Sequence, residues 1–234
     1  PRETPLLRMN PFAFPENIHI LEHIDRLVEI FNACWPMYAA MPAVLKDAIE
    51  RSYQKVGWDL RNSESEKGIF PTFFDLLDIL PGVIEESHYS KDTQSDYVGA
   101  LCTRVKSLTN GIYGSVLCAE DALSDAEMFD QNVIVDLSRV GSMETKSLLM
   151  GILVMKLQEY RMCSSGMNSR LRHVTVLEEA HNLLRKTSAE QSQEGANLQG
   201  KSVEMLANAI AEMRTYGEGF IIADQAPGLL DMSV

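Results

Sequence analysis

The chain has 234 residues, of which 45% are hydrophobic, and a formal net charge of −12 at pH 7. This length and apolar content suit one large domain or two small ones with a hydrophobic core. The acidic balance excludes a basic module that coats nucleic acid with its whole surface, and leaves room only for a local nucleic-acid contact.

The cysteines and the apolar runs indicate the cellular compartment of the protein and its relation to membranes. Four cysteines are scattered along the chain without a C-x-x-C pair, which is typical of a reduced, cytoplasmic protein. No apolar run approaches about 18 residues, so we expect no membrane span. The chain begins at Pro1 and ends soon after an expected strand, so we expect a fragment of a longer protein.

The first half of the chain is predicted to be helical. Residues 1–17 are rich in proline and form an expected extended lead-in from the core. Apolar residues at helical spacing and prolines at first turns predict helices at residues 18–33, 42–56, 71–80 and 93–109. Pro81-Gly82 is expected to end the third helix, and Thr93 to cap the fourth. We assign residues 18–112 to an α-helical subdomain.

The apolar period changes in the second half. β-branched runs and helical patterns predict, in order, a strand at 131–137, a helix at 143–162, a strand at 173–178, a helix at 201–216 and a strand at 220–224. Strands that alternate with helices predict a parallel sheet with right-handed crossovers. We therefore assign residues 113–234 to an α/β core, with the helical subdomain inserted before it.

Two adjacent carboxylates end the strand at 173–178. Glu178 and Glu179 follow a short apolar run, and the carboxyl ends of parallel strands are where open α/β sheets bind ligands. Nucleotide-hydrolysing enzymes place a Mg²⁺-holding acid and a water-polarising acid in this way. The alternative is that the acids only open a helix, whose N-terminus favours negative charge.

The next strand ends in polar residues as well. Gln225 follows Asp224 at the end of the 220–224 strand, and is therefore expected at the same sheet edge as the two acids. A carboxamide there can contact both a γ-phosphate and the attacking water. Asp136 ends the 131–137 strand, and either supports the Mg²⁺ site or caps the turn before Ser142.

The segments VTVLEEAHNLL, at residues 174–184, and EMRTYGEGFIIADQAP, at residues 212–227, resemble the HerA-type ATPases of the HerA/FtsK group. The resemblance spans most of the chain and is strongest from residue 131 to residue 227. It implies a RecA-like P-loop NTPase core, here partial, that binds ATP and Mg²⁺. It also implies a homo-oligomeric ring that moves double-stranded DNA, together with a nuclease or another effector partner.

The resemblance implies roles for five residues. Glu178 would hold Mg²⁺ through water, and Glu179 would be the catalytic glutamate. His181 would couple the site to the next helix or subunit, and Gln225 would sense the γ-phosphate. Arg214 would face the phosphate of a neighbouring subunit.

Two motif matches have weaker support. The resemblance places the Walker A loop before Pro1, yet GANLQGKS at residues 195–202 fits the P-loop pattern. No strand precedes this match, and it follows the acids instead of preceding them. We expect a mobile loop there, with Lys201 free to touch DNA. His19 to His23 fit the H-x-x-E-H zinc pattern, although the start of an exposed helix explains them as well.

The sequence therefore predicts part of an ATP-driven DNA translocase or helicase with no membrane segment. A protein-translocating secretion-type ATPase shares the same core and is the first alternative. A non-catalytic interaction module, in which Glu178 and Glu179 can be replaced without loss of function, is the second. A small-molecule kinase built around Lys201 is the third.

Overall fold

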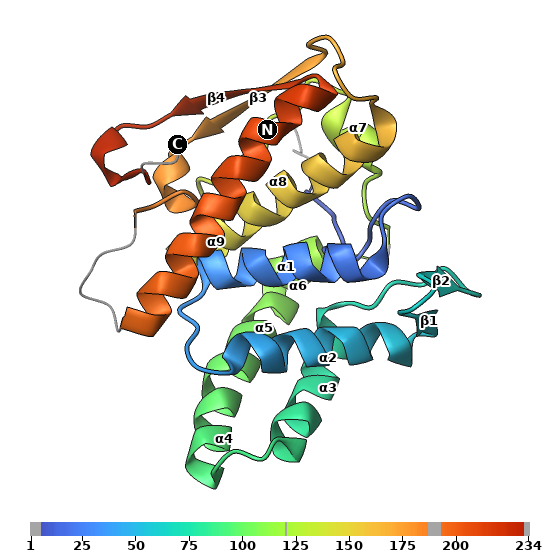
Figure 1. Ribbon diagram of the computed structural model, residues 1–234, viewed down its shortest axis with the longest axis vertical. Coiled ribbons are helices and arrows are strands. Elements are labelled where there is room, and N and C mark those ends of the chain that lie inside the picture. The colour runs from blue at the N-terminus through green and yellow to red at the C-terminus, as the bar shows by residue number, and fades with distance from the viewer. Residues whose placement is uncertain (1–5, 120, 187–192, 232–234) are drawn as a thin grey trace.

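The structure, a computed structural model, describes residues 6–119, 121–186 and 193–231. Figure 1 shows a helical block around helices α1 to α6, and beside it a two-stranded parallel sheet that lies over two long helices, α8 and α9. The fold is therefore mixed α/β. Within these residues no helix is both long enough and apolar enough to cross a membrane.

The predicted helices between residues 18 and 109 are present in the structure as α-helices, with boundaries that differ in places. The helices of the helical block are α1 (Ile20–Cys34), α2 (Met41–Lys55), α3 (Phe73–Glu86), α4 (Lys91–Tyr97), α5 (Thr103–Thr109) and α6 (Gly111–Leu117), with a π-helical turn (Val98–Cys102) after α4 and a short antiparallel hairpin, β1 (Trp58–Asp59) and β2 (Glu64–Ser65), after α2. The predicted stripe of α1 is fully buried at Ile20, Ile24 and Leu27, so its apolar face lies in the core.

Two predicted helix boundaries are wrong. Pro81 lies inside α3, which continues to Glu86, so the missing proline N–H does not end the helix; burial of Val83 and Ile84 in the core favours its continuation. The cap of α4 is Ser90 and not Thr93, because the Ser90 hydroxyl accepts from the N–H of Thr93.

The α/β part contains α7 (Asp125–Phe129), α8 (Met143–Ser164), β3 (His173–Glu178), α9 (Gln193–Glu212) and β4 (Glu218–Ala223), with 3-10 turns at Ala180–Asn182, Met213–Tyr216 and Pro227–Leu229. Strands β3 and β4 are parallel, as predicted, and Thr175 pairs with Phe220. Helix α9 forms the crossover between them and begins eight residues earlier than expected.

The predicted strand at 131–137 is wrong. Residues 132–137 have no regular secondary structure and form no ladder with any strand that the structure describes, and Ile134 is 93% exposed. An apolar β-branched run sets a preference for extended backbone, but a strand also needs a neighbour to bond. A short apolar run such as that of β3 is typical of a buried strand, but β3 is buried on one face only: Leu177 packs on the core, while Val174 and Val176 are exposed on the other face.

Helix α1 connects the two parts of the fold, because it packs against α2 on one side and against α8 and α9 on the other. Its His23 and the Glu159 of α8 are fully buried, with Nδ1 of His23 3.0 Å from a Glu159 oxygen. Arg26 donates to the same carboxylate at 3.2 Å. Burial acts to raise the pKa of Glu159, but these two partners hold it below its ordinary value.

Candidate functional site

The acids and the glutamine lie at one edge of the parallel sheet. Glu178 pairs in register with Ala223, the last residue of β4. Consequently Glu179 and Asp224 each begin the turn that follows a strand, and Gln225 comes next along the second turn. Parallel pairing thus brings together two chain segments that are more than 40 residues apart in sequence.

Glu179 has an unusual backbone conformation. Its φ is +50° and its ψ is 45°, in the left-handed region that non-glycine residues rarely occupy. Such strain persists where the surrounding structure holds the turn in place. The Glu179 side chain is half exposed, with Lys146 Nζ 3.8 Å from one oxygen and the Asn182 amide 3.4 Å from it. The tight turn therefore presents this carboxylate to solvent at the sheet edge.

The side chains of Glu178 and Gln225 are both exposed and make no hydrogen bond or ion pair with any residue within the described ranges. Their oxygen atoms are thus open to solvent at this edge. A carboxylate in this position suits the water shell of Mg²⁺, which keeps several waters and prefers oxygen ligands. A carboxamide beside it can both donate and accept a hydrogen bond.

His181 bonds to the neighbouring strand end. Its Nδ1 lies 2.8 Å from Oδ2 of Asp224, and its backbone N–H donates to the same oxygen at 2.8 Å. The other Asp224 oxygen accepts from the N–H of Ala226 at 2.7 Å. Burial acts to raise the pKa of Asp224, but these N–H donors hold it below its ordinary value. Sequence reasoning missed this anchor, although Asp224 directly precedes Gln225.

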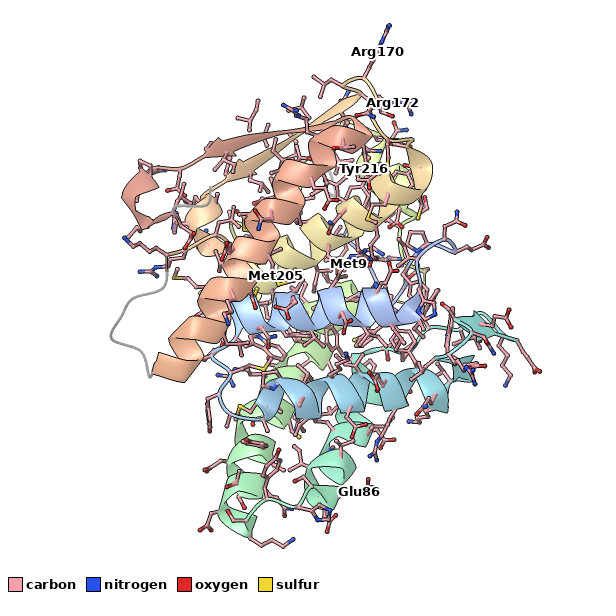
Figure 2. The ribbon with its side chains drawn as sticks, in the orientation of Figure 1. Met9, Glu86, Arg170, Arg172, Met205 and Tyr216 are labelled. Atoms are coloured by element: carbon pink, nitrogen blue, oxygen red, sulfur yellow. The ribbon has the colours of Figure 1, made fainter. Side chains whose placement is uncertain are left out.

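Arg214 lies away from this edge. It belongs to the 3-10 turn Met213–Tyr216, which leads into the amino end of β4, so roughly 20 Å of strand separates it from Gln225. The loop before β3 lies at the same end, where the N–H of Arg172 donates to the carbonyl of Gly217; Figure 2 shows Arg170, Arg172 and Tyr216 there. Arg214 therefore does not join the acids of its own chain.

Asp136 caps a turn. Its side chain accepts from the N–H of Ser138 at 2.8 Å, as aspartates do in tight turns. Ser142 caps α8 by accepting from the N–H of Thr145. Of the two interpretations drawn from the sequence, the structure gives Asp136 the capping contact.

The P-loop match is helical. Residues 195–202 lie inside α9, which begins at Gln193, so the expectation of a mobile loop is wrong for them. A phosphate cradle needs free backbone N–H groups in a loop, whereas those of a helix interior are bonded to its own carbonyls. Ser202, which would have to reach Mg²⁺, is buried and donates to Glu29 at 2.6 Å.

We therefore expect the Lys201→Ala substitution to leave nucleotide binding unchanged. Lys201 is exposed on α9, and its helix offers no phosphate cradle. Titration calorimetry with Mg-ATP on the full-length protein should give the same Kd, within about twofold, as the wild type. A loss of binding in this variant would restore the kinase interpretation.

The H-x-x-E-H match does not form a metal site. His19 caps α1, with its Nδ1 accepting from the N–H of Leu21, while His23 is buried against Glu159. Among the described residues no three His, Cys, Asp or Glu side chains are grouped so that they could hold a metal.

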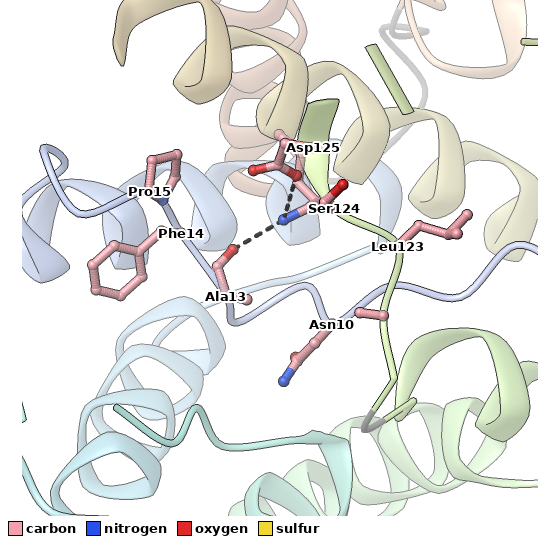
Figure 3. A pocket seen from close by; sticks show the side chains of 9 residues that line it. Asn10, Ala13, Phe14, Pro15, Leu123, Ser124 and Asp125 are labelled. Atoms are coloured by element: carbon pink, nitrogen blue, oxygen red, sulfur yellow. Dashed lines mark hydrogen bonds and ion pairs between the residues drawn. The ribbon is translucent and has the colours of Figure 1, made fainter. Parts of the chain in front are cut away.

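Two small cavities lie away from the acids. The one in Figure 3 has a volume of about 190 Å³ and is lined by Asn10, Phe14 and Asp125, among others. The other, of about 120 Å³, lies beside Arg161 and His173. Pockets for cofactor-sized ligands measure roughly 300–1,000 Å³, so neither cavity suits a nucleotide. The open sheet edge remains the candidate site.

Comparison with solved structures gives a likeness in fold, whereas comparison with protein families and curated proteins gives none. No protein-family model matches the chain, and no curated protein does either. Among solved structures the chain is similar to VirB4 of Thermoanaerobacter pseudethanolicus, with a TM-score of 0.66 over 97% of its length and 16% sequence identity. At that identity the likeness shows the fold alone. The chain covers 56% of that structure's chain, so it spans about half of its length.

Proposed function

We propose that this chain is part of the ATP-hydrolysing core of a P-loop ATPase that resembles VirB4. The observation that carries the proposal is the shared edge of β3 and β4, where Glu178, Glu179 and Gln225 follow two paired parallel strands. Ligands of open α/β folds bind outside the carboxyl ends of strands. The likeness to VirB4, a secretion-system ATPase, supports nucleotide binding in general.

The proposed mechanism is positioning and charge stabilisation around Mg-ATP. Glu178 would hold Mg²⁺ through its water shell, and the ion would supply positive charge that offsets the charge of the phosphates. Glu179 would orient the attacking water, and Gln225 would contact the γ-phosphate. The described residues hold no phosphate cradle, and a Walker A loop from elsewhere in the full-length protein would have to supply it.

The substrate class proposed first is protein. The structural likeness favours a secretion-type ATPase over a DNA translocase, and the net charge of −12 suits a protein substrate better than a polyanion. The double-stranded DNA motor is the second candidate, and its support is the sequence of residues 174–184 and 212–227. Either motor would work in the cytoplasm as a ring of identical subunits. In the ring, Arg214 would face the nucleotide of the neighbouring subunit across a heterologous interface. A nuclease or another effector would accompany the DNA motor.

ATP turnover by the full-length protein separates these candidates. We expect Mg²⁺-dependent phosphate release that rises several-fold with an unfolded protein substrate and stays unchanged with double-stranded DNA. Stimulation by DNA alone would select the translocase. If the wild-type protein released no phosphate, and Glu178 and Glu179 variants functioned in cells as the wild type does, the non-catalytic module would be the better interpretation.

A further inference from the structure

We propose that Asp224 is a positioning residue that fixes the tautomer of His181 and joins the turn after the acids to the turn that carries Gln225. The inference rests on the proposed ATP hydrolysis and deepens it, because it gives a role to a carboxylate that touches neither the nucleotide nor the metal in that mechanism. His181 then couples the acids to the neighbouring strand of the same sheet.

Asp224 is a buried carboxylate that bridges two turns. The Asp224 side chain is 2% exposed, and its two oxygens face three nitrogen atoms of His181 and Ala226, with shortest distances of 2.7 to 2.8 Å. A buried carboxylate without water needs such donors. Two of the donors belong to the turn after β3 and one to the turn after β4, so this carboxylate bridges both turns.

The charge of Asp224 provides the second step. An ionised carboxylate only accepts hydrogen bonds, so the ring nitrogen that faces it must carry the proton. His181 therefore has Nδ1–H, and its Nε2 keeps a free lone pair in the neutral ring. The ring is 20% exposed, and Nε2 has no partner within the part of the chain that the structure describes. This acceptor consequently lies open to solvent at the sheet edge.

The position of His181 in the chain provides the third step. Glu179 lies two residues before His181 in a strained turn, and Gln225 lies next to Asp224. Because Asp224 holds the backbone N–H of His181 as well as its ring, a shift of Gln225 moves the Glu179 turn. Loss of the γ-phosphate at Gln225 is thereby communicated to the catalytic acid through one carboxylate.

Asp224→Asn tests the tautomer directly. The Asn oxygen can accept from the N–H of Ala226 while its amide nitrogen, in the place of Oδ2, donates to Nδ1 and so drives the proton to Nε2, as an Asp-to-Asn change does in the Ser-His-Asp triad. The backbone N–H of His181 then loses its acceptor. Long-range ¹H–¹⁵N NMR near pH 8 on the 234-residue chain, with the His181 signals identified through His181→Gln, should show Nδ1–H in the wild type and Nε2–H in Asp224→Asn. A wild-type Nε2–H signal would overturn the proposal.

Turnover of the full-length protein tests the coupling. We expect Asp224→Asn to lower kcat about tenfold or more while KM for ATP stays within about twofold. The double variant Asp224→Asn/His181→Gln should lose less than the sum of the two single losses, because part of the effect of Asp224 passes through the His181 ring. Asp59→Asn is the matched control, since Asp59 also accepts turn N–H groups, at Arg61 and Asn62, but has no histidine partner.

These measurements distinguish a failure of the positioning role from a failure of the proposed ATPase function. Additive losses in the double variant, or unchanged kcat in Asp224→Asn with the reversed tautomer, would overturn the positioning role and leave the proposed ATPase intact. A wild-type protein without turnover would instead contradict the proposed function, while the NMR measurement still decides whether Asp224 sets the His181 tautomer. Thermal unfolding of each variant identifies a loss of turnover that comes from a loss of fold.

Discussion

Replacing Glu179 with glutamine is expected to abolish ATP hydrolysis by the full-length protein and to leave Mg-ATP binding intact. The amide has nearly the same shape but can neither orient water as a charged acceptor nor take its proton, which should lower kcat by about 10²–10⁴-fold. Phosphate-release kinetics measure the loss, and titration calorimetry checks that Kd for Mg-ATP is retained.

Glu204→Gln is the matched control for this experiment. Glu204 is an exposed glutamate on α9, so its substitution removes the same charge without touching the sheet edge. We expect wild-type turnover in this variant. If Glu179→Gln also turned over at the wild-type rate, the left-handed turn at Glu179 would have no catalytic meaning and the non-catalytic module would be the better interpretation.

The sequence was most informative where local pattern and pairing agree. Strands β3 and β4 have apolar runs joined by a long helical segment, and consecutive units of this kind pair in parallel with few alternatives. Once the pair is expected, Glu178, Glu179 and Gln225 fall at one edge without further information. The register is shifted by one residue, because β4 spans Glu218–Ala223 instead of the predicted 220–224 and Glu178 therefore pairs with Ala223. The roles of these residues stay predictions.

The wrong predictions have a common physical origin. The backbone conformation of a segment depends on contacts with distant parts of the chain, and the sequence of the segment alone does not specify these contacts. Residues 132–137 have the composition of a strand but no ladder partner among the described residues. GANLQGKS matches the P-loop sequence pattern but lies inside a helix, and its Ser202 donates a hydrogen bond to Glu29 of α1. Asp224 and His181 are 43 residues apart, and only the folded sheet brings them into contact.

Another buried network lies at the opposite end of the sheet from the acids. Glu218, at the start of β4, is fully buried and accepts from Arg161 Nε at 2.8 Å and from the Thr175 hydroxyl at 2.7 Å, with His173 Nδ1 2.8 Å away. The Arg161 side chain is 6% exposed and also donates to Asp130. The network joins α8 to both strands, so it fixes the sheet on its supporting helix.

We expect Glu218→Gln to lower the free energy of unfolding by about 3 kcal/mol, because it removes the buried carboxylate that compensates the Arg161 charge and leaves the half-exposed Asp130 as its acidic partner. Glu212→Gln, which changes an exposed glutamate at the end of α9, should change it by less than about 0.5 kcal/mol. Urea unfolding followed by far-UV circular dichroism measures both values.

The double variant Arg161→Met/Glu218→Met separates charge burial from packing. Two methionines fill similar volume without a charge, and replacing a buried ion pair with apolar side chains is often neutral. The double variant should therefore be more stable than Glu218→Gln, although it has lost both charges. If it were less stable, the loss of the bonds to Thr175, His173 and Asp130 would dominate, and the network would contribute through its hydrogen bonds more than through its opposite charges.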